Sequence, residues 1–165
     1  MWIEMEIRSL TKEDSPSLWK INQEGLPGTG KVSEDEIKSL LDYSELSIGA
    51  FDGDILQGFV ICLPPETEYT SLNYAWFNQR YDDFLYVDRI AVSQKHRNKN
   101  VGTLLYGEVI SLSAQNQVPI AAEVNLTPPN PGSIRFHERN GFTDVGVFSH
   151  GDKTVKMLLR PNSQV

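Results

Sequence analysis

The chain has 165 residues, a formal net charge of -7 and 39% hydrophobic residues, which is typical of one folded domain spanning residues 1–165. The acidic net charge argues against a nucleic-acid partner. No apolar run approaches the ~20 residues that cross a membrane, which argues against a membrane anchor. The first residues lack a basic region, which argues against a signal peptide. The one cysteine, Cys62, stands in an apolar run, so we expect a buried thiol in a reducing cytoplasm.

The N-terminal third predicts a strand and two helices. Residues 2–8 alternate between polar and apolar side chains, as in a half-buried strand. A helix is expected after Thr11, which can act as its cap. A second helix is expected after Ser33, because Glu36 stands three residues further on and completes a capping box.

The middle of the chain predicts a hairpin, a loop and a strand. Residues 46–63 form the hairpin around Asp52-Gly53, a strong turn signal. Residues 64–82 are expected to form a long loop rich in aromatic residues. Residues 84–92 are apolar and form the next strand, and residues 103–115 form a helix.

The last third completes an alternating pattern. A strand at 119–126 follows the helix, and a crossover of this kind places it parallel to the strand at 84–92. Asn130-Pro131 opens a short helix, with asparagine as the cap and proline at the first helical position. Gly141 is expected to end that helix in the left-handed conformation. Two final strands are predicted at about 143–148 and 154–160.

A basic loop joins the strand at 84–92 to the helix that follows it. Three of the fifteen Lys and Arg residues, Lys95, Arg97 and Lys99, stand within five positions here. A strand, a polar turn and a helix N-terminus together present backbone N–H groups and a helix dipole to an anion. The loop therefore indicates a ligand that carries phosphate, unless it is a solvated turn whose charges bind nothing.

Two spaced motifs resemble the GNAT superfamily of N-acetyltransferases. Arg97 to Gly102 reads Arg-x-x-Asn-x-Gly, and Asn130-x-x-Ser-x-x-Phe-His is followed by Gly141-Phe142. The apolar stretch FLYVDRIAV and the aromatic residues before it are also similar to a bacterial subfamily of predicted acetyltransferases. The resemblance implies an α/β (α+β) fold with a mixed, mostly antiparallel sheet, one parallel and splayed strand pair, and helices on both faces.

The resemblance also implies an acyltransferase that moves the acetyl group of acetyl-CoA to a small-molecule or peptide amine. The amine attacks directly in a ternary complex, without a metal or a covalent enzyme intermediate. The loop N–H groups would hold the pyrophosphate of CoA, and the edge of the preceding strand would pair with pantetheine. The residues implied in cofactor binding are Ile90, Ala91, Val92, Arg97, Asn98, Lys99, Asn100, Val101, Gly102, Thr103, Asn130 and Phe136.

The chain departs from the family pattern at three positions. Asn98 and Asn100 stand where glycine is frequent, and asparagine is the residue other than glycine that most readily enters the left-handed region. We therefore expect the turn to persist. His137 stands where the family has the tyrosine that protonates the departing thiolate. It is either a hydrogen-bond donor to that sulfur or a partly exposed helix residue.

Two carboxylates compete for the role of general base. Glu123 precedes Asn130 by seven residues, the spacing at which some relatives keep a catalytic glutamate. Asp88 is the alternative, provided that a β-bulge turns it toward the cleft. The alternative for each carboxylate is a structural role, in which it sits on a strand and pairs with a nearby cation such as Arg89.

The aromatic residues of 64–82 either wall the acceptor site or form hydrophobic cover; they are Tyr74, Trp76, Phe77 and Tyr81. A CoA-binding module without catalysis is the alternative function, and the final strands offer an edge for a homodimer.

Residues 25–31, GLPGTGK, resemble the start of a phosphate-binding P-loop. We reject that reading, because position 32 is Val and the preceding residues predict a helix and not a strand.

Overall fold

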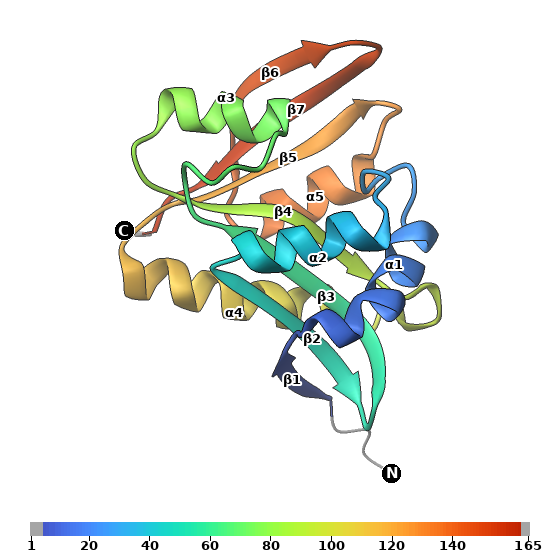
Figure 1. Cartoon of the computed structure of the whole chain (residues 1–165). Helices are drawn as coiled ribbons and strands as arrows, with labels where there is room; N and C mark the ends of the chain where they lie inside the picture. The colour runs from blue at the N-terminus through green and yellow to red at the C-terminus, as the bar shows by residue number, and fades with distance from the viewer. Residues whose placement is uncertain (1–4, 163–165) are drawn as a thin grey trace.

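The structure is a computed structural model that describes residues 5–162, and its centre is a seven-stranded sheet (Figure 1). The strand order is β1-β2-β3-β4-β5-β7-β6, and only the β4–β5 pair is parallel. This confirms the mixed, mostly antiparallel sheet implied by the sequence. The strands are β1 (Glu6–Ser9), β2 (Leu46–Asp52), β3 (Ile55–Leu63), β4 (Leu85–Val92), β5 (Ile120–Thr127), β6 (Thr143–His150) and β7 (Lys153–Arg160).

Helices cover both faces of the sheet and enclose two hydrophobic cores. The first core packs Leu18, Ile37 and Phe77, from three different helices, against one face. The second packs Leu105 and Tyr106 against the other. The helices are α1 (Ser15–Glu24), α2 (Glu34–Tyr43) and α3 (Leu72–Arg80) on the first face, and α4 (Val101–Asn116) and α5 (Pro131–Arg139) on the second.

The structure confirms two predicted helix caps and one predicted turn. Ser33 and Glu36 form the capping box of α2, with Ser33 Oγ accepting from the Glu36 N–H at 3.1 Å. Asn130 Oδ1 caps α5 by accepting from the Ser133 N–H at 3.3 Å. Gly53 in the hairpin turn has φ +58°. The predicted first strand begins at residue 2, and residues 2–4 lie outside the described residues.

The prediction of an irregular loop over 64–82 is wrong for Leu72–Arg80, which forms α3. The Ser71 side chain caps this helix by accepting from the Tyr74 N–H at 3.2 Å. Tyr74 and Phe77, one turn apart, are buried together with Trp76. A helix of nine residues is marginal in isolation. Packing of its aromatic face therefore stabilises it, and the local pattern alone does not reveal that contact.

The parallel pair opens almost at once. β4 and β5 are paired only at Leu85↔Ile120 and Tyr86↔Ala121. Opposite β3, Arg89 pairs with Ile61 and Val87 with Cys62, so that Asp88 is an extra residue in a β-bulge. The expected splay and the bulge are thus both present, and the facing edges of β4 and β5 are left free to line a site. In residues 5–162, no helix has the length and apolar character that a bilayer crossing requires.

Candidate active site

Three adjoining cavities follow the opening between β4 and β5. We name them the loop cavity, beside the basic loop (about 510 Å³), the passage, under the α1–α2 connection (about 450 Å³), and the inner cleft, beside α3 (about 440 Å³). Ile90 of β4 and Ser133 of α5 line all three. The cavities are therefore neighbouring parts of one site.

The loop cavity gathers the residues predicted to bind the cofactor. All of them line it except Lys99, and His96 and Arg139 join them. Asn98 and Asn100 both have φ +64°, which confirms that each asparagine takes the left-handed conformation expected of a glycine. The lining residues from the predicted set are Ile90, Ala91, Val92, Arg97, Asn98, Asn100, Val101, Gly102, Thr103, Asn130 and Phe136.

The N-terminus of α4 opens on this cavity. Its N-cap residue, Asn100, makes no hydrogen bond from its side chain to the first turn. The first N–H groups of a helix have no partner within the helix, so they remain available to an anion. Gly102 lies against Phe136, whose Cζ would be 3.4 Å from an added Cβ. A Cβ here would be in ordinary van der Waals contact with the Phe136 ring.

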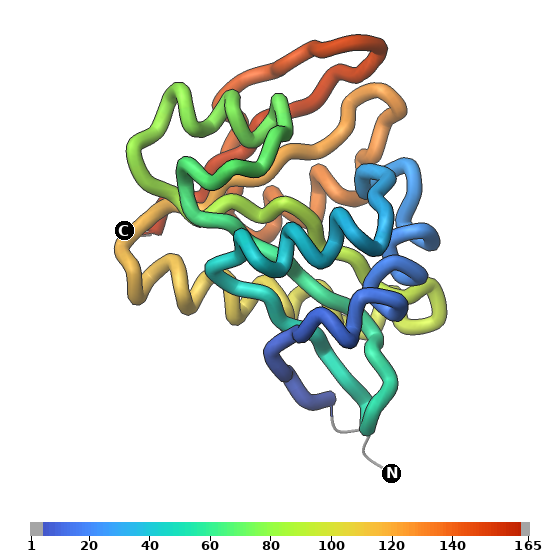
Figure 2. The backbone as a smooth tube through the Cα atoms, in the orientation of Figure 1, coloured from blue at the N-terminus to red at the C-terminus, as the bar shows by residue number. Residues whose placement is uncertain are grey.

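The α1–α2 connection forms the roof of the passage, where it runs beside the ends of β5 and α5 (Figure 2). Arg97 Nη2 donates to the Glu24 carbonyl at 3.0 Å, and Asn125 Nδ2 donates to the Pro27 carbonyl at 3.2 Å. The GLPGTGK segment within this connection follows helix α1 and not a buried strand, which agrees with rejecting the P-loop. It instead lines the passage and the inner cleft.

Glu123 lies at the inner cleft, on β5 where that strand has left β4. Its Oε1 accepts a hydrogen bond from the Tyr86 hydroxyl at 2.7 Å and one from Asn73 Nδ2 at 3.3 Å. Its Oε2 is buried and has no hydrogen-bond partner among residues 5–162. Burial raises the pKa of this carboxyl to about 8, and the hydrogen bond from Tyr86 opposes that rise. A carboxyl of this kind is suited to exchanging a proton near neutral pH.

Asp88 also lines the inner cleft, but its charge is already matched. The bulge brings Asp88 and its neighbour Arg89 together, with Arg89 Nε 2.7 Å from Asp88 Oδ2 and both side chains at least 94% buried. Arg89 Nη1 also donates to Asn22 Oδ1 and to the Gly30 carbonyl, each at 3.0 Å. The pair thus connects β4 to α1 and to the roof of the passage. This is the structural role, a strand carboxylate paired with Arg89, that the sequence left open for Asp88.

His137 is buried on α5 and uses both of its ring nitrogens. Nδ1 is 2.7 Å from the Ser133 carbonyl, and Nε2 is 2.7 Å from the Tyr106 hydroxyl. A carbonyl can only accept, so Nδ1 carries the proton and Nε2 accepts from Tyr106. Burial lowers the pKa of His137, so the ring is neutral at pH 7. The residue is not partly exposed, as one alternative expected, but fully enclosed.

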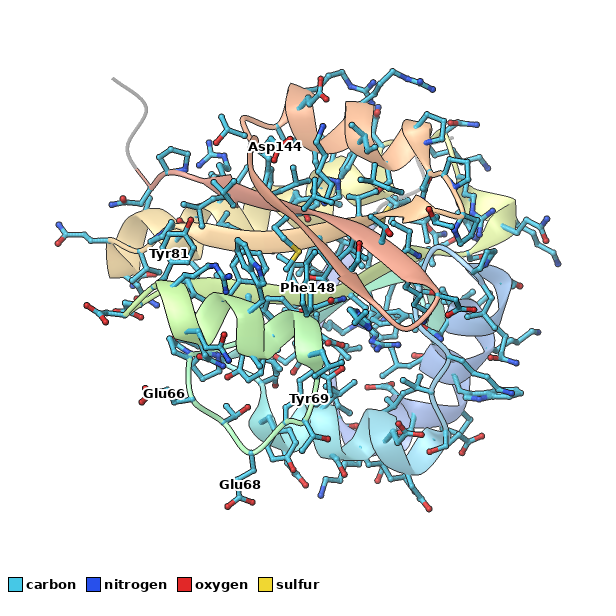
Figure 3. The ribbon with its side chains drawn as sticks, turned by 90° about the horizontal axis from the view of Figure 1, so that it is seen from above. Glu66, Glu68, Tyr69, Tyr81, Asp144 and Phe148 are labelled. Carbon is cyan, nitrogen blue, oxygen red and sulfur yellow. The ribbon has the colours of Figure 1, made fainter. Side chains whose placement is uncertain are left out.

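The four aromatic residues expected to wall the acceptor site lie elsewhere. Tyr74, Trp76 and Phe77 are buried in the first core, and Tyr81 packs against it. None of the four is among the residues that line the inner cleft in the described part of the chain. The tyrosines that do line it are Tyr69, just before α3 (Figure 3), and Tyr106 of α4. The helical fold of Leu72–Arg80 turns the predicted set toward the sheet.

Sequence reasoning missed three hydrogen-bond partners of Glu123 and His137, which are Tyr86, Asn73 and Tyr106. Tyr86 pairs with Ala121, two residues before Glu123, so the parallel register places Tyr86 and Glu123 on the same face. The sequence predicted the parallel pairing of these strands, but the register comes from the structure. Asn73 and Tyr106 carry no such signal, since their positions depend on how α3 and α4 pack. Within the described residues, no group of three or more His, Cys, Asp or Glu side chains is arranged to hold a metal ion.

Comparison with known proteins agrees with this geometry. The sequence model of the Acetyltransferase (GNAT) family matches residues 6–142. Among solved structures, the ribosomal-protein-S18-alanine N-acetyltransferase of Escherichia coli superposes with a TM-score of 0.75 at 18% identity, covering 98% of this chain and 96% of its own. NAA60 of Arabidopsis thaliana, solved with a bisubstrate analogue, gives 0.75 at 18% identity over 96% and 98% of the two chains.

Naa50 of the same plant, solved with the bisubstrate analogue CoA-Ac-MVNAL, gives a TM-score of 0.73 at 15% identity over 94% and 97% of the two chains. At these identities the similarity establishes the fold. A search of curated protein sequences finds no match to this chain.

Proposed function

Because the chain belongs to the Acetyltransferase (GNAT) family, we propose that it is an acetyl-CoA-dependent N-acetyltransferase that acetylates an amine directly in a ternary complex. One observation carries the proposal beyond the family. Glu123 lines the inner cleft, which adjoins the loop cavity through the passage, and its buried Oε2 has no hydrogen-bond partner among residues 5–162. A general base at the end of a channel that begins at an anion site fits this reaction.

Different residues are proposed to bind different parts of acetyl-CoA along the three cavities. In this proposal the first N–H groups of α4, together with Arg97, hold the pyrophosphate. The free edge of β4 at Ile90 and Val92 offers backbone groups to pantetheine amides, as a sheet edge does to a peptide. Acetyl-CoA, when bound, supplies the activated acetyl thioester. The free edge of β4 beyond Tyr86 and the helix N-terminus without a side-chain cap support this assignment.

Glu123 prepares the acceptor. An amine attacks only in its neutral form, so the bound ammonium must lose a proton, and Oε2 of Glu123 takes it. The neutral nitrogen would then form the new amide bond as the carbon–sulfur bond breaks and the electron pair leaves on sulfur, and the excess proton left on nitrogen would pass to the thiolate to give free CoA thiol. Asp88 is the less suitable base, because its carboxylate is already paired with Arg89 at 2.7 Å.

His137 does not present a free proton to the sulfur in this arrangement, because its N–H faces the Ser133 carbonyl. A thiol with a pKa of ~8.5 is a fair leaving group without such help. If His137 does donate, its proton must first move to Nε2, the nitrogen that Tyr106 occupies. This observation also favours a second candidate function, a CoA-binding module that does not catalyse transfer.

The acceptor is proposed to be a small-molecule or peptide amine. The inner cleft, at about 440 Å³, has room for one end of such a molecule. Two of the similar structures contain bisubstrate analogues, and one of these analogues carries the peptide MVNAL. Peptides with free N-termini therefore belong in the acceptor panel beside small amines.

Two measurements test the proposal. Acetyl-CoA at about 100 times its Kd should raise Tm, since it adds about 2.7 kcal/mol to the free energy of unfolding. Free CoA thiol should appear when protein, acetyl-CoA and a panel of amines are mixed. No shift in Tm at millimolar acetyl-CoA would refute cofactor binding.

Variants of the two carboxylates assign the base. Glu123→Gln should lower kcat by about 10²–10⁴-fold while leaving the Kd of acetyl-CoA unchanged. Asp88→Asn should mainly destabilise the fold, by leaving the buried Arg89 without its partner. Binding of acetyl-CoA without thiol release across the whole panel would instead support the non-catalytic module.

A further inference from the structure

Glu123 is held by two donors on one side only. The Tyr86 hydroxyl, from β4, and Asn73 Nδ2, from α3, both reach Oε1, at 2.7 Å and 3.3 Å. Tyr86 is 1% exposed, so its hydroxyl has little access to water. Nothing in residues 5–162 hydrogen-bonds to Oε2. The two oxygens of this carboxyl are therefore not equivalent.

Asn73 is in turn oriented by the hairpin between β6 and β7. His150 Nε2 is 2.9 Å from Asn73 Oδ1. The amide oxygen accepts from the imidazole, and the amide nitrogen is left to donate to Glu123. α3 and the β6–β7 hairpin lie side by side in both views (Figures 1 and 3). A hydrogen-bonded chain from His150 through Asn73 to Glu123 therefore crosses from the hairpin to β5.

We propose that Asn73 is a positioning residue, which together with Tyr86 occupies Oε1 of Glu123 and so reserves Oε2 for the proton of the acceptor amine. This rests on the proposed function, in which Glu123 is the base. Oε1 accepts two hydrogen bonds whether or not Oε2 is protonated. The proton therefore arrives and leaves without rearranging the partners, which is the preorganisation that proton transfer requires.

The donors also tune when Glu123 titrates. Burial raises its pKa, whereas the hydrogen bonds from Tyr86 and Asn73 lower it. A donor to a carboxylate stabilises the charged form, so removing a donor makes the proton harder to lose. The working range of the base should then move to higher pH.

Other charged and titratable groups face this carboxyl. Asp88 and Arg89 approach from β4 and act in opposite directions on the pKa of Glu123. Tyr106 and His137 line the same cleft from α4 and α5, and His150 and Lys153 line it from the hairpin. The variants below leave all of these groups unchanged, except where His150 itself is replaced.

The test is a direct titration of Glu123 in the intact protein with its glutamate side chains labelled at ¹³Cδ. The resonance of Glu123 is the one lost in Glu123→Gln. We expect its midpoint to rise by about one pH unit in Tyr86→Phe, by about half a unit in Asn73→Ala, and by less in His150→Ala. Asn73→Asp, which keeps the size but replaces the donor with a negative charge, should raise it further than Asn73→Ala.

Asn78→Ala is the matched control. Asn78 lies on the same helix, and its side chain accepts from the Glu66 N–H, away from the cleft. This variant should leave the midpoint unchanged. If Asn73→Ala behaves like Asn78→Ala, Asn73 does not position the base and the proposal is wrong. Circular dichroism confirms that each variant retains its helices.

Turnover supplies a second readout once an acceptor is known. With the same acceptor throughout, Asn73→Ala should move the acidic limb of the kcat/KM profile to higher pH and recover most of the lost activity above it. A uniform loss at all pH values would point to misfolding instead. The titration does not depend on turnover, so its failure is distinct from failure of the proposed acetyl transfer.

Discussion

The loop cavity and the inner cleft lie at opposite ends of one opening, and they are built from different groups. The loop cavity relies on backbone N–H groups, left-handed turns at Asn98 and Asn100, and the start of α4. The inner cleft relies on side chains from α3, β4, β5 and the β6–β7 hairpin that meet around Glu123.

This difference affects how each region responds to sequence change. A site made from backbone tolerates any residue that permits the same φ and ψ, so glycine and asparagine are interchangeable in it. A site made from convergent side chains depends on the elements that carry them. The cleft should therefore be sensitive to changes in packing far from Glu123, and the loop should not.

The largest effect is expected from the core beneath the cleft. Phe77→Ala should lower the free energy of unfolding by about 3–5 kcal/mol, because Phe77 is fully buried and its loss leaves a cavity under α3. Denaturant unfolding measures this. Tyr69→Ala is the comparison, since Tyr69 lines the cleft. It should cost less stability and raise the KM for the acceptor. If Phe77→Ala were neutral for stability, α3 would not be held by its aromatic face.

A smaller effect is expected from the buried carboxyl. The folded-state pKa of Glu123, about 8, lies above its ordinary value of 4.5. The fold therefore binds that proton more tightly than the unfolded chain does, and the stability it contributes falls as pH rises from about 4.5 to 8. Glu123→Gln cannot titrate, so its free energy of unfolding should lack this decrease with pH.

The difference in Tm between Glu123→Gln and the wild type should thus grow from pH 5 to pH 8 by roughly 10 °C, at about 1.4 kcal/mol for each pKa unit and about 2–4 °C for each kcal/mol. Thermal melts at several pH values measure it. A difference that stays constant with pH would show that Glu123 titrates normally in the fold.

The smallest effect is expected in the loop. Asn100→Gly should leave the Kd of CoA within about threefold, since Asn100 has φ +64° and its side chain does not cap α4. Asn100→Val should weaken binding, because a β-branched side chain costs about 1–2 kcal/mol in the left-handed region. Calorimetric titration with CoA compares them. A large loss in Asn100→Gly would mean that the Asn100 side chain contacts the ligand.

Local signals predicted most of the fold. The capping box at Ser33, the turn at Gly53 and the cap at Asn130 fix element boundaries through neighbours a few residues away. Such interactions are written in consecutive residues, so a sequence pattern reveals them. The one wrong element, α3, has a weak local pattern and depends on contacts with the sheet.

The sequence by itself determined the strand, loop and helix around Asn98 and Asn100 and the left-handed conformation of both asparagines, because these depend on residue type and short spacing. The candidacy of Glu123 came from the resemblance to the GNAT family. Only the tertiary structure decided which oxygen of Glu123 is free, that Asp88 is paired with Arg89, and that His137 faces Tyr106 and Ser133. The bulge that brings the adjacent Asp88 and Arg89 together depends on pairing with β3, and the contacts of Glu123 reach Asn73, which is 50 residues away in the chain. Packing brings them together, and no short pattern records it.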